Sequence, residues 1–272
     1  MSKRFFPTAA AILGFAAAAL GHGDLHEAID GVSRAITAAP RDATLLLRRA
    51  ELRRLHGEFA AAEADYASVR RLRPDLTIVE FGLAALRHAQ GRDDDALPLL
   101  DRFLRSTPEH PGARVLRAEI LEKRGAWEKA EADLAVAAPA EPHYATKRAE
   151  LLARHGRFED AARCLDEASR ARGRVPVLEQ QALEMEERAG DTESALRRLD
   201  RLIAQEPRPD LWLARKASLL TTLGRGEEAK AAWQEATTAL EKVPTEKRNL
   251  EMNRSLAAQI EAGLAAPAAL AP

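Results

Sequence analysis

Small and apolar positions recur along this chain with a period of 34 residues, and a glycine marks each period. The glycines are Gly23, Gly57, Gly91, Gly125, Gly156, Gly190 and Gly224, which are 34 residues apart except for one interval of 31. Five residues after each glycine stands an alanine, and nine after it stands an apolar residue, as at Ala62 and Tyr66. Residues four apart share one face of an α-helix. The pattern therefore predicts a helix after every glycine, each burying the same face.

Another helix is predicted before each later glycine, because alanine or leucine stands seven residues ahead of it, from Ala50 to Ala217. Glycine ends this first helix of the pair, since it adopts the left-handed conformation without steric cost. Asp24 and Asp191 directly follow two of the glycines and are predicted to cap the second helix. Prolines separate most pairs. The interval of 31 residues predicts one second helix that is shorter by about one turn.

This periodicity resembles the tetratricopeptide repeat family, whose 34-residue repeat carries small residues at positions eight and twenty, glycine near fifteen and proline at thirty-two. In one repeat Ala50, Gly57, Ala62 and Pro74 fill these positions. The resemblance covers about residues 23–241. It implies an all-α, right-handed α-solenoid of about six helix-turn-helix repeats, with an N-terminal half-repeat, a C-terminal capping helix and a role in binding other proteins.

The two ends of the chain suggest further segments. Lys3 and Arg4 precede an uncharged stretch that ends in small residues, which predicts a signal peptide over residues 1–21 and an exported, periplasmic or extracellular protein. The alternative is an N-terminal helix of the fold. A half-repeat helix is expected over 22–42, the solenoid over 43–243 and a disordered tail over 265–272. Met252, Leu256 and Ile260 share one face and predict the capping helix over 244–264.

Composition narrows the functional classes. The 272 residues carry a formal net charge of −1, so no basic surplus favours nucleic acid. The single cysteine, Cys164, excludes an internal disulfide framework and is expected to be a small buried hydrophobe. Phosphate-binding glycine loops, paired metal-binding histidines and nucleophile motifs are missing from the sequence. We therefore expect neither an enzyme nor, after signal removal, a stable membrane span.

The resemblance also implies a groove lined by repeat positions two, five, nine and twelve of the first helices. These positions hold Glu51, Arg54, Ile78, Phe81, His88, Glu119, Glu122, Glu150, Glu184 and Glu187. Glutamate dominates position nine, which predicts a groove for a cationic or polar protein segment, with Ile78 and Phe81 as apolar anchors. The lysine, arginine and asparagine set with which the family grips a C-terminal carboxylate is missing.

Two alternatives remain open at this level. The glutamates could simply solvate an inner face, with the arginines of the repeated Arg-Ala-Glu at Arg49, Arg117 and Arg148 pairing with carboxylates of adjacent repeats. A separate function is copper binding by a processed N-terminus. Cleavage after Gly21 would place the α-amine and ring of His22 together, with His26 nearby, and imidazole suits Cu(II). No other cofactor is expected.

Overall fold

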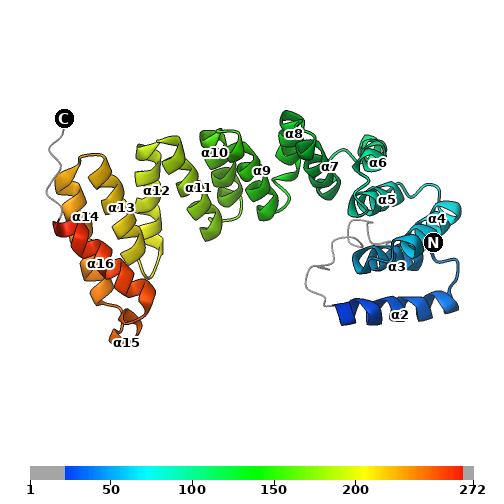
Figure 1. Cartoon of the computed structure of the whole chain (residues 1–272), viewed down its shortest axis with the longest axis horizontal. Coiled ribbons are helices and arrows are strands. Elements are labelled where there is room, and N and C mark those ends of the chain that lie inside the picture. Colours follow the sequence, from blue (N-terminus) through cyan, green and yellow to red (C-terminus); the bar gives the residue numbers. More distant parts are fainter. Residues whose placement is uncertain (1–21, 266–272) are drawn as a thin grey trace, which may run out of the picture. The chain divides into compact units, whose positions relative to one another are not determined.

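The computed structural model describes residues 22–265, and these form 15 helices (Figure 1). They fall into two compact bodies that divide between Ala140 and Glu141. The N-terminal body contains α2 (His22–Ala38), α3 (Ala43–His56), α4 (Phe59–Leu72), α5 (Ile78–Ala89), α6 (Asp93–Ser106), α7 (Pro111–Lys123) and α8 (Trp127–Ala137). The C-terminal body contains α9 (Pro142–Arg154), α10 (Phe158–Arg170), α11 (Pro176–Ala189), α12 (Thr192–Gln205), α13 (Asp210–Thr222), α14 (Gly226–Glu241), α15 (Thr245–Arg248) and α16 (Glu251–Ala265).

Helix pairs joined at a glycine make up most of both bodies, as the periodicity predicts. Six of the seven marker glycines, from Gly57 to Gly224, have a positive φ of 71–86°. At the first of these turns, the Gly57 amide donates to the Arg54 carbonyl oxygen. The alanine five residues after each of the six glycines is buried between the paired helices, from Ala62 to Ala229. The small side chain lets the two backbones approach closely, which is why the position recurs.

The core of the N-terminal body depends on one especially close helix contact. Tyr66 on α4 is fully buried, and its ring lies against the backbone of Gly82 on α5. A Cβ atom at residue 82 would come within 2.5 Å of Tyr66 Cε1 and 2.9 Å of Glu51 Oε1. Only glycine therefore fits at this crossing without a shift of its neighbours.

The C-terminal body ends at α16, which packs on α13 and α14. Leu256 and Ile260 of this helix are buried, and the ring of Trp233 on α14 lies against Gly263. The prediction that Met252 shares the buried face of this helix is wrong, because Met252 is 67% exposed. Asn253 is buried in its place, since its amide donates to the Lys247 carbonyl oxygen at 2.7 Å.

The structure tests three further predictions made from the sequence. Helix α8 has 11 residues against 14 in α4, as the short interval predicts. Asp191 caps α12, because its side chain accepts from the Ser194 amide at 3.1 Å. The corresponding prediction at the first glycine is wrong: α2 already begins at His22, so Gly23 and Asp24 lie inside its first turn. Because the helix already includes Gly23, this glycine does not form the turn that precedes a helix.

The predicted signal peptide over residues 1–21 lies outside the described residues, as does nearly all of the predicted tail. Ala265, where the tail was expected to start, is the last residue of α16. Between residues 22 and 265, none of the helices combines the length and the apolar character that crossing a bilayer requires.

Candidate functional site

In the N-terminal body, several predicted groove residues are engaged inside the fold. The Glu51 carboxylate accepts a hydrogen bond from the Tyr66 hydroxyl and two from the Arg54 guanidinium, both at 3.1 Å. Together with the burial of Tyr66, this holds α3 against α4 and α5. Ile78 is 6% exposed within the core, so the prediction that it anchors a ligand is wrong. It lies at the start of α5, where it packs inward beside Val79.

Phe81 and His88 also contact their own body. The Phe81 ring is stacked on Phe103 with centroids 5.6 Å apart, and it lies 4.9 Å from the ring of His110. His88 Nδ1 lies 2.6 Å from Asp93 Oδ1. Glu119 and Glu122 are partly exposed on α7, and both take part in interactions. The glutamates predicted to line a groove in this body therefore mainly make contacts within the body itself.

In the C-terminal body, two of the predicted glutamates face one hollow. A cavity of about 340 Å³ runs between α9 and α11, and both Glu150 and Glu184 line it with exposed side chains. Its apolar lining comes from Ala149, Leu165 and Met185, all of them buried. The structure thus places Glu150 and Glu184 on one cavity with an apolar floor.

A second hollow of about 440 Å³ lies among α11, α13 and α16. Glu187 lines it and accepts two hydrogen bonds from Arg215, at 2.9 and 2.5 Å. These hydrogen bonds raise the pKa of Arg215 despite its burial, and the charge of Glu184 acts in the same direction. Glu187 is therefore neutralised by direct hydrogen bonds from Arg215, whereas Glu184 interacts with Arg215 only through its charge.

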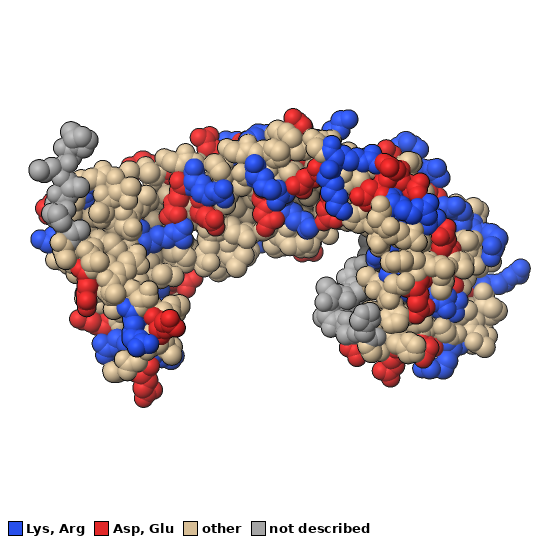
Figure 2. Space-filling model, viewed as in Figure 1, with Lys and Arg blue, Asp and Glu red and all other residues tan. Residues whose placement is uncertain are grey.

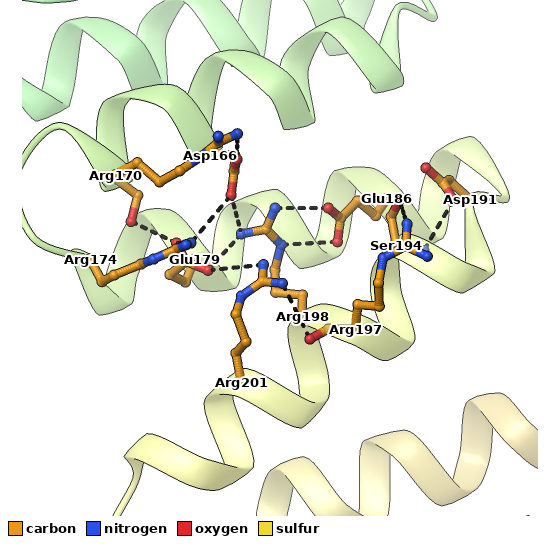
Figure 3. Close-up of polar contacts among 11 residues, drawn as sticks. Asp166, Arg170, Arg174, Glu179, Glu186, Asp191, Ser194, Arg197, Arg198 and Arg201 are labelled. Carbon is orange, nitrogen blue, oxygen red and sulfur yellow. Dashed lines mark hydrogen bonds and ion pairs between the residues drawn. The ribbon is translucent and has the colours of Figure 1, made fainter.

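A buried ionic cluster fixes α11, which lines the first hollow, between α10 and α12 (Figure 3). Arg198 of α12 is 2% exposed. Its guanidinium donates twice to Glu186, at 2.9 and 2.8 Å, and once to Glu179, at 2.6 Å, while Asp166 Oδ1 lies 3.0 Å from Nη1. The Ser169 hydroxyl donates to the other oxygen of Glu179 at 2.8 Å. Since α11 carries Glu184, this cluster also sets one wall of the hollow.

The cluster perturbs the titration of its members in a consistent direction. Burial alone would lower the pKa of Arg198, but the hydrogen bonds and charges of Glu186 and Glu179 raise it above its usual value. Burial would raise the pKa of Glu179, yet the Ser169 hydroxyl and the charge of Arg198 hold it below its usual range. Asp166 is likewise lowered against its burial, by Arg170 and Arg198. All of these groups are thus held in their charged forms.

In the N-terminal body, buried aspartates take the repeat position that Arg198 holds in the ionic cluster, and arginines supply the counter-charge. The residue eight positions after the turn glycine is a buried aspartate in two repeats, Gly57 to Asp65 and Gly125 to Asp133, and it is Arg198 after Gly190. Asp65 accepts from Arg53 at 2.7 Å, as Glu186 accepts from Arg198 across the same separation of 12 residues. This position therefore tolerates either charge, provided that the helix facing it supplies the counter-charge.

For two of the three Arg-Ala-Glu segments, these contacts show that the main partner of the arginine differs from the predicted carboxylate of an adjacent repeat. Arg49 donates to Asp65 at 2.9 and 2.7 Å, and Arg117 donates to Asp133 at 2.7 Å. Both aspartates belong to the same repeat as the arginine. Both arginines also reach the preceding helix pair or half-repeat: Arg117 donates to Asp101 at 2.7 Å, and Arg49 donates to the Ser33 hydroxyl on α2 at 3.3 Å. The main partner lies in the same repeat because the paired helices are in closer contact than consecutive repeats.

Comparison with known proteins decides the family. The tetratricopeptide repeat model matches residues 13–76, 81–145 and 186–244, which is more than half of the chain. The chain belongs to the tetratricopeptide repeat family. No curated protein sequence matches the chain.

Several solved structures are similar to this chain at low sequence identity. Yeast Tom70 is 19% identical with a TM-score of 0.51, over 86% of this chain and 46% of its own. A tetratricopeptide repeat protein from Parabacteroides merdae is 17% identical, with a TM-score of 0.45, over 88% of this chain and 93% of its own. A chain of the Naa15/Naa10 complex bound to HypK-THB is 18% identical, with a TM-score of 0.47, over 88% of this chain and 38% of its own. The likeness to Tom70 concerns the fold.

Two apolar residues of the tetratricopeptide surface were missed by the sequence analysis. Val177 and Leu211 are the second residues of α11 and α13, and they are 58% and 51% exposed. Both occupy repeat position two, one of the positions expected to face a ligand. Reading that position in every repeat, rather than at Ile78 alone, would have found them.

The residues considered for metal binding give a separate result. His26 is exposed on α2, with Nε2 at 3.8 Å from an oxygen of Asp30. Within residues 22–265, no group of three or more His, Cys, Asp or Glu side chains is placed to hold a metal ion. The side chain of His22 lies outside the described part of the chain, so copper binding there stays a prediction. Cys164 is buried, as expected, with its thiol 3.7 Å from the Ala145 carbonyl oxygen.

Proposed function

We propose that this tetratricopeptide repeat protein is a non-enzymatic scaffold whose groove between α9 and α11 binds a cationic segment of a partner protein. The family supports the general role, because tetratricopeptide repeats serve protein–protein interaction. The observation that carries the specific role is the pair of exposed carboxylates, Glu150 and Glu184, over one apolar floor.

The groove favours a positive charge for a simple electrostatic reason. Across residues 22–265, neither Glu150 nor Glu184 forms a direct ion pair with another side chain, and Glu184 interacts with Arg215 only through its charge. Two carboxylates on opposite sides of one hollow repel each other, and a lysine or arginine side chain between them relieves that repulsion. Burial of the apolar part of such a side chain on Ala149 and Met185 adds to the attraction.

The local arrangement matters more than the charge of the whole protein. Figure 2 shows acidic and basic side chains interspersed over the visible face of the described residues. With a net charge of −1, the chain offers no strong long-range attraction to a basic partner. A basic partner segment must then be selected by short-range contacts in the groove. The exposed Val177, near the start of α11, offers a further apolar contact on one of the two groove helices.

An exported location belongs to the same proposal. It rests on the composition of residues 1–21, where Lys3 and Arg4 precede an uncharged stretch. Expression with and without these residues, followed by cell fractionation, tests it: the full chain is expected in the periplasm or medium and the shortened chain in the cytoplasm. Equal distribution of the two would contradict it.

The groove is tested by affinity capture from the source organism with a charge-reversed variant. Glu150→Lys with Glu184→Lys is expected to lose a partner that the unmodified protein retains. The matched control is Glu167→Lys with Glu235→Lys, which makes the same change in net charge on exposed residues of the second helices α10 and α14. Equal capture by the groove variant and the control would refute the role of the groove.

A further inference from the structure

The groove between α9 and α11 changes its chemistry in order along its length. At one end the Thr146 hydroxyl donates to the side-chain oxygen of Gln181 at 2.9 Å and bridges the two helices. One turn further stand Glu150 and Glu184. A turn beyond them stand Arg154 and Arg188, which line the same cavity. The groove therefore runs from neutral to acidic to basic.

On α11, Arg188 of the basic level does not pair with Glu184 of the acidic level, one turn before it. Glutamate and arginine four residues apart on a helix commonly pair. Here, however, the Arg188 guanidinium lies 4.4 Å from the centre of the Phe158 ring instead of on Glu184. Arg188 is exposed, so its edge can still donate hydrogen bonds to a ligand. Stacking on Phe158 holds the planar group in place beforehand, which reduces the entropy lost on binding.

The spacing of the two levels matches an extended protein segment. Four helical residues advance by about 6 Å along the axis, at about 1.5 Å per residue. Two residues of an extended segment advance by about 6.6 Å, and their side chains point to the same side. A side chain that reaches Glu150 and Glu184 therefore has its next neighbour on the same side at the level of Arg188.

We infer that the groove selects an extended partner segment in which a lysine or arginine is separated by one residue from an aspartate or glutamate. The basic side chain binds between Glu150 and Glu184, and the acidic side chain accepts hydrogen bonds from Arg188. The inference rests on the proposed function of the groove and specifies its ligand. Adjacent basic and acidic residues do not fit, because their side chains point to opposite sides of an extended chain.

The test uses three fluorescein-labelled heptapeptides and the full chain, with binding measured by fluorescence anisotropy. The matching peptide is Ser-Thr-Lys-Thr-Glu-Thr-Ser. The spacing control, Ser-Thr-Thr-Lys-Glu-Thr-Ser, has the same composition with the charges adjacent. The charge control, Ser-Thr-Lys-Thr-Gln-Thr-Ser, lacks the acid. We expect both controls to bind about fivefold more weakly than the matching peptide, since each loses one ionic contact.

Two variants of the protein test which groove residue binds each charged side chain of the peptide. Arg188→Gln is expected to abolish the preference for the matching peptide over the charge control and to leave the charge control's affinity unchanged. Glu184→Gln is expected to weaken all three peptides. Equal binding of the three peptides to the unmodified protein would overturn the inference while leaving the cationic groove intact, and so would a preference that survives in Arg188→Gln. Failure of all three peptides to bind overturns the inference, and the capture experiment then decides the groove separately.

Discussion

His110 is an unusual helix cap because it can act only in one protonation state. Its Nδ1 accepts a hydrogen bond from the Ala113 amide at 3.1 Å at the start of α7. A protonated ring has no lone pair left for this contact. The ring lies 5.1 Å from that of Phe103, and burial lowers the pKa of His110 below its ordinary 6.5. The fold therefore favours the neutral form.

This predicts a pH dependence for the stability of the N-terminal body. Because the folded pKa lies below the unfolded value, the contribution of His110 is complete above about pH 6.5 and is lost as the pH falls through the folded pKa. His110→Asn retains a capping side chain that does not titrate. Between pH 7.5 and 5, the unmodified protein should lose about 1 kcal/mol relative to this variant in urea unfolding followed by circular dichroism.

The matched control for that measurement is His143→Asn, which removes an exposed histidine from α9. This variant should show the same pH dependence as the unmodified protein. If His110→Asn also follows the unmodified protein at every pH, the capping contact does not contribute to stability.

Individual residue roles were the least predictable feature of the sequence. Glu51 and Glu150 hold the same repeat position, but only Glu51 has a tyrosine hydroxyl to accept from, because Tyr66 stands where Leu165 stands in the later repeat. Ile78 was assigned to the ligand face by position alone. Its burial depends on how α5 is rotated against its neighbours, which no single position encodes.

At the scale of elements, the crossing of α4 and α5 depends on the absence of a side chain at Gly82. Gly82→Ala is expected to destabilise the protein by about 1–3 kcal/mol, because the added methyl group overlaps Tyr66. Gly31→Ala on α2 is the control, because a Cβ atom there would meet only Arg34, at 4.0 Å. This substitution should stabilise the helix by about 0.5–1 kcal/mol. Denaturant unfolding of both variants measures the difference. Equal effects of the two substitutions would contradict the close crossing.

The ionic cluster of α10, α11 and α12 makes a second element-scale prediction. Arg198→Met leaves Glu186 buried without the guanidinium that binds it and leaves Glu179 with only Arg174, at 3.2 Å, and Arg201, at 3.7 Å. The substitution is expected to cost about 3–5 kcal/mol. Adding Glu179→Gln and Glu186→Gln should recover part of that loss, because the amides need no cation. Urea unfolding midpoints of the single and triple variants provide the measurement. A triple variant no more stable than Arg198→Met would mean that shape, rather than charge, holds these helices.

The helix pairs themselves were predictable because their determinants are local. Turn glycines, buried alanines and the short α8 all follow from spacing within one repeat. The sign reversal from Asp65 and Asp133 to Arg198 was also visible in the sequence, eight residues after each glycine. The inward face of α16 could not be predicted in this way. Asn253 is buried there because it bonds to the Lys247 carbonyl oxygen and to Arg208, which is 3.1 Å away in space and 45 residues away in the sequence.

At the scale of the molecule, the two bodies use one repeat for different purposes. In the N-terminal body, the ligand-facing positions stabilise the fold through Glu51, Phe81 and His88. In the C-terminal body, Glu150 and Glu184 remain directed into a hollow, and the ionic cluster keeps α11 in place. A family assignment alone predicts a binding surface along the whole chain, whereas the contacts confine the strongest candidate to α9 and α11.

Site-specific photocrosslinking in the source organism tests the binding role of that groove most directly. With p-benzoylphenylalanine in place of Gln181, inside the groove, we expect a crosslinked partner protein that disappears when Glu150 and Glu184 are changed to lysine. The same group in place of Glu167, on α10, should give no such product. A partner that crosslinks from position 167 but not from 181, or that persists after the charge reversal, would contradict the account.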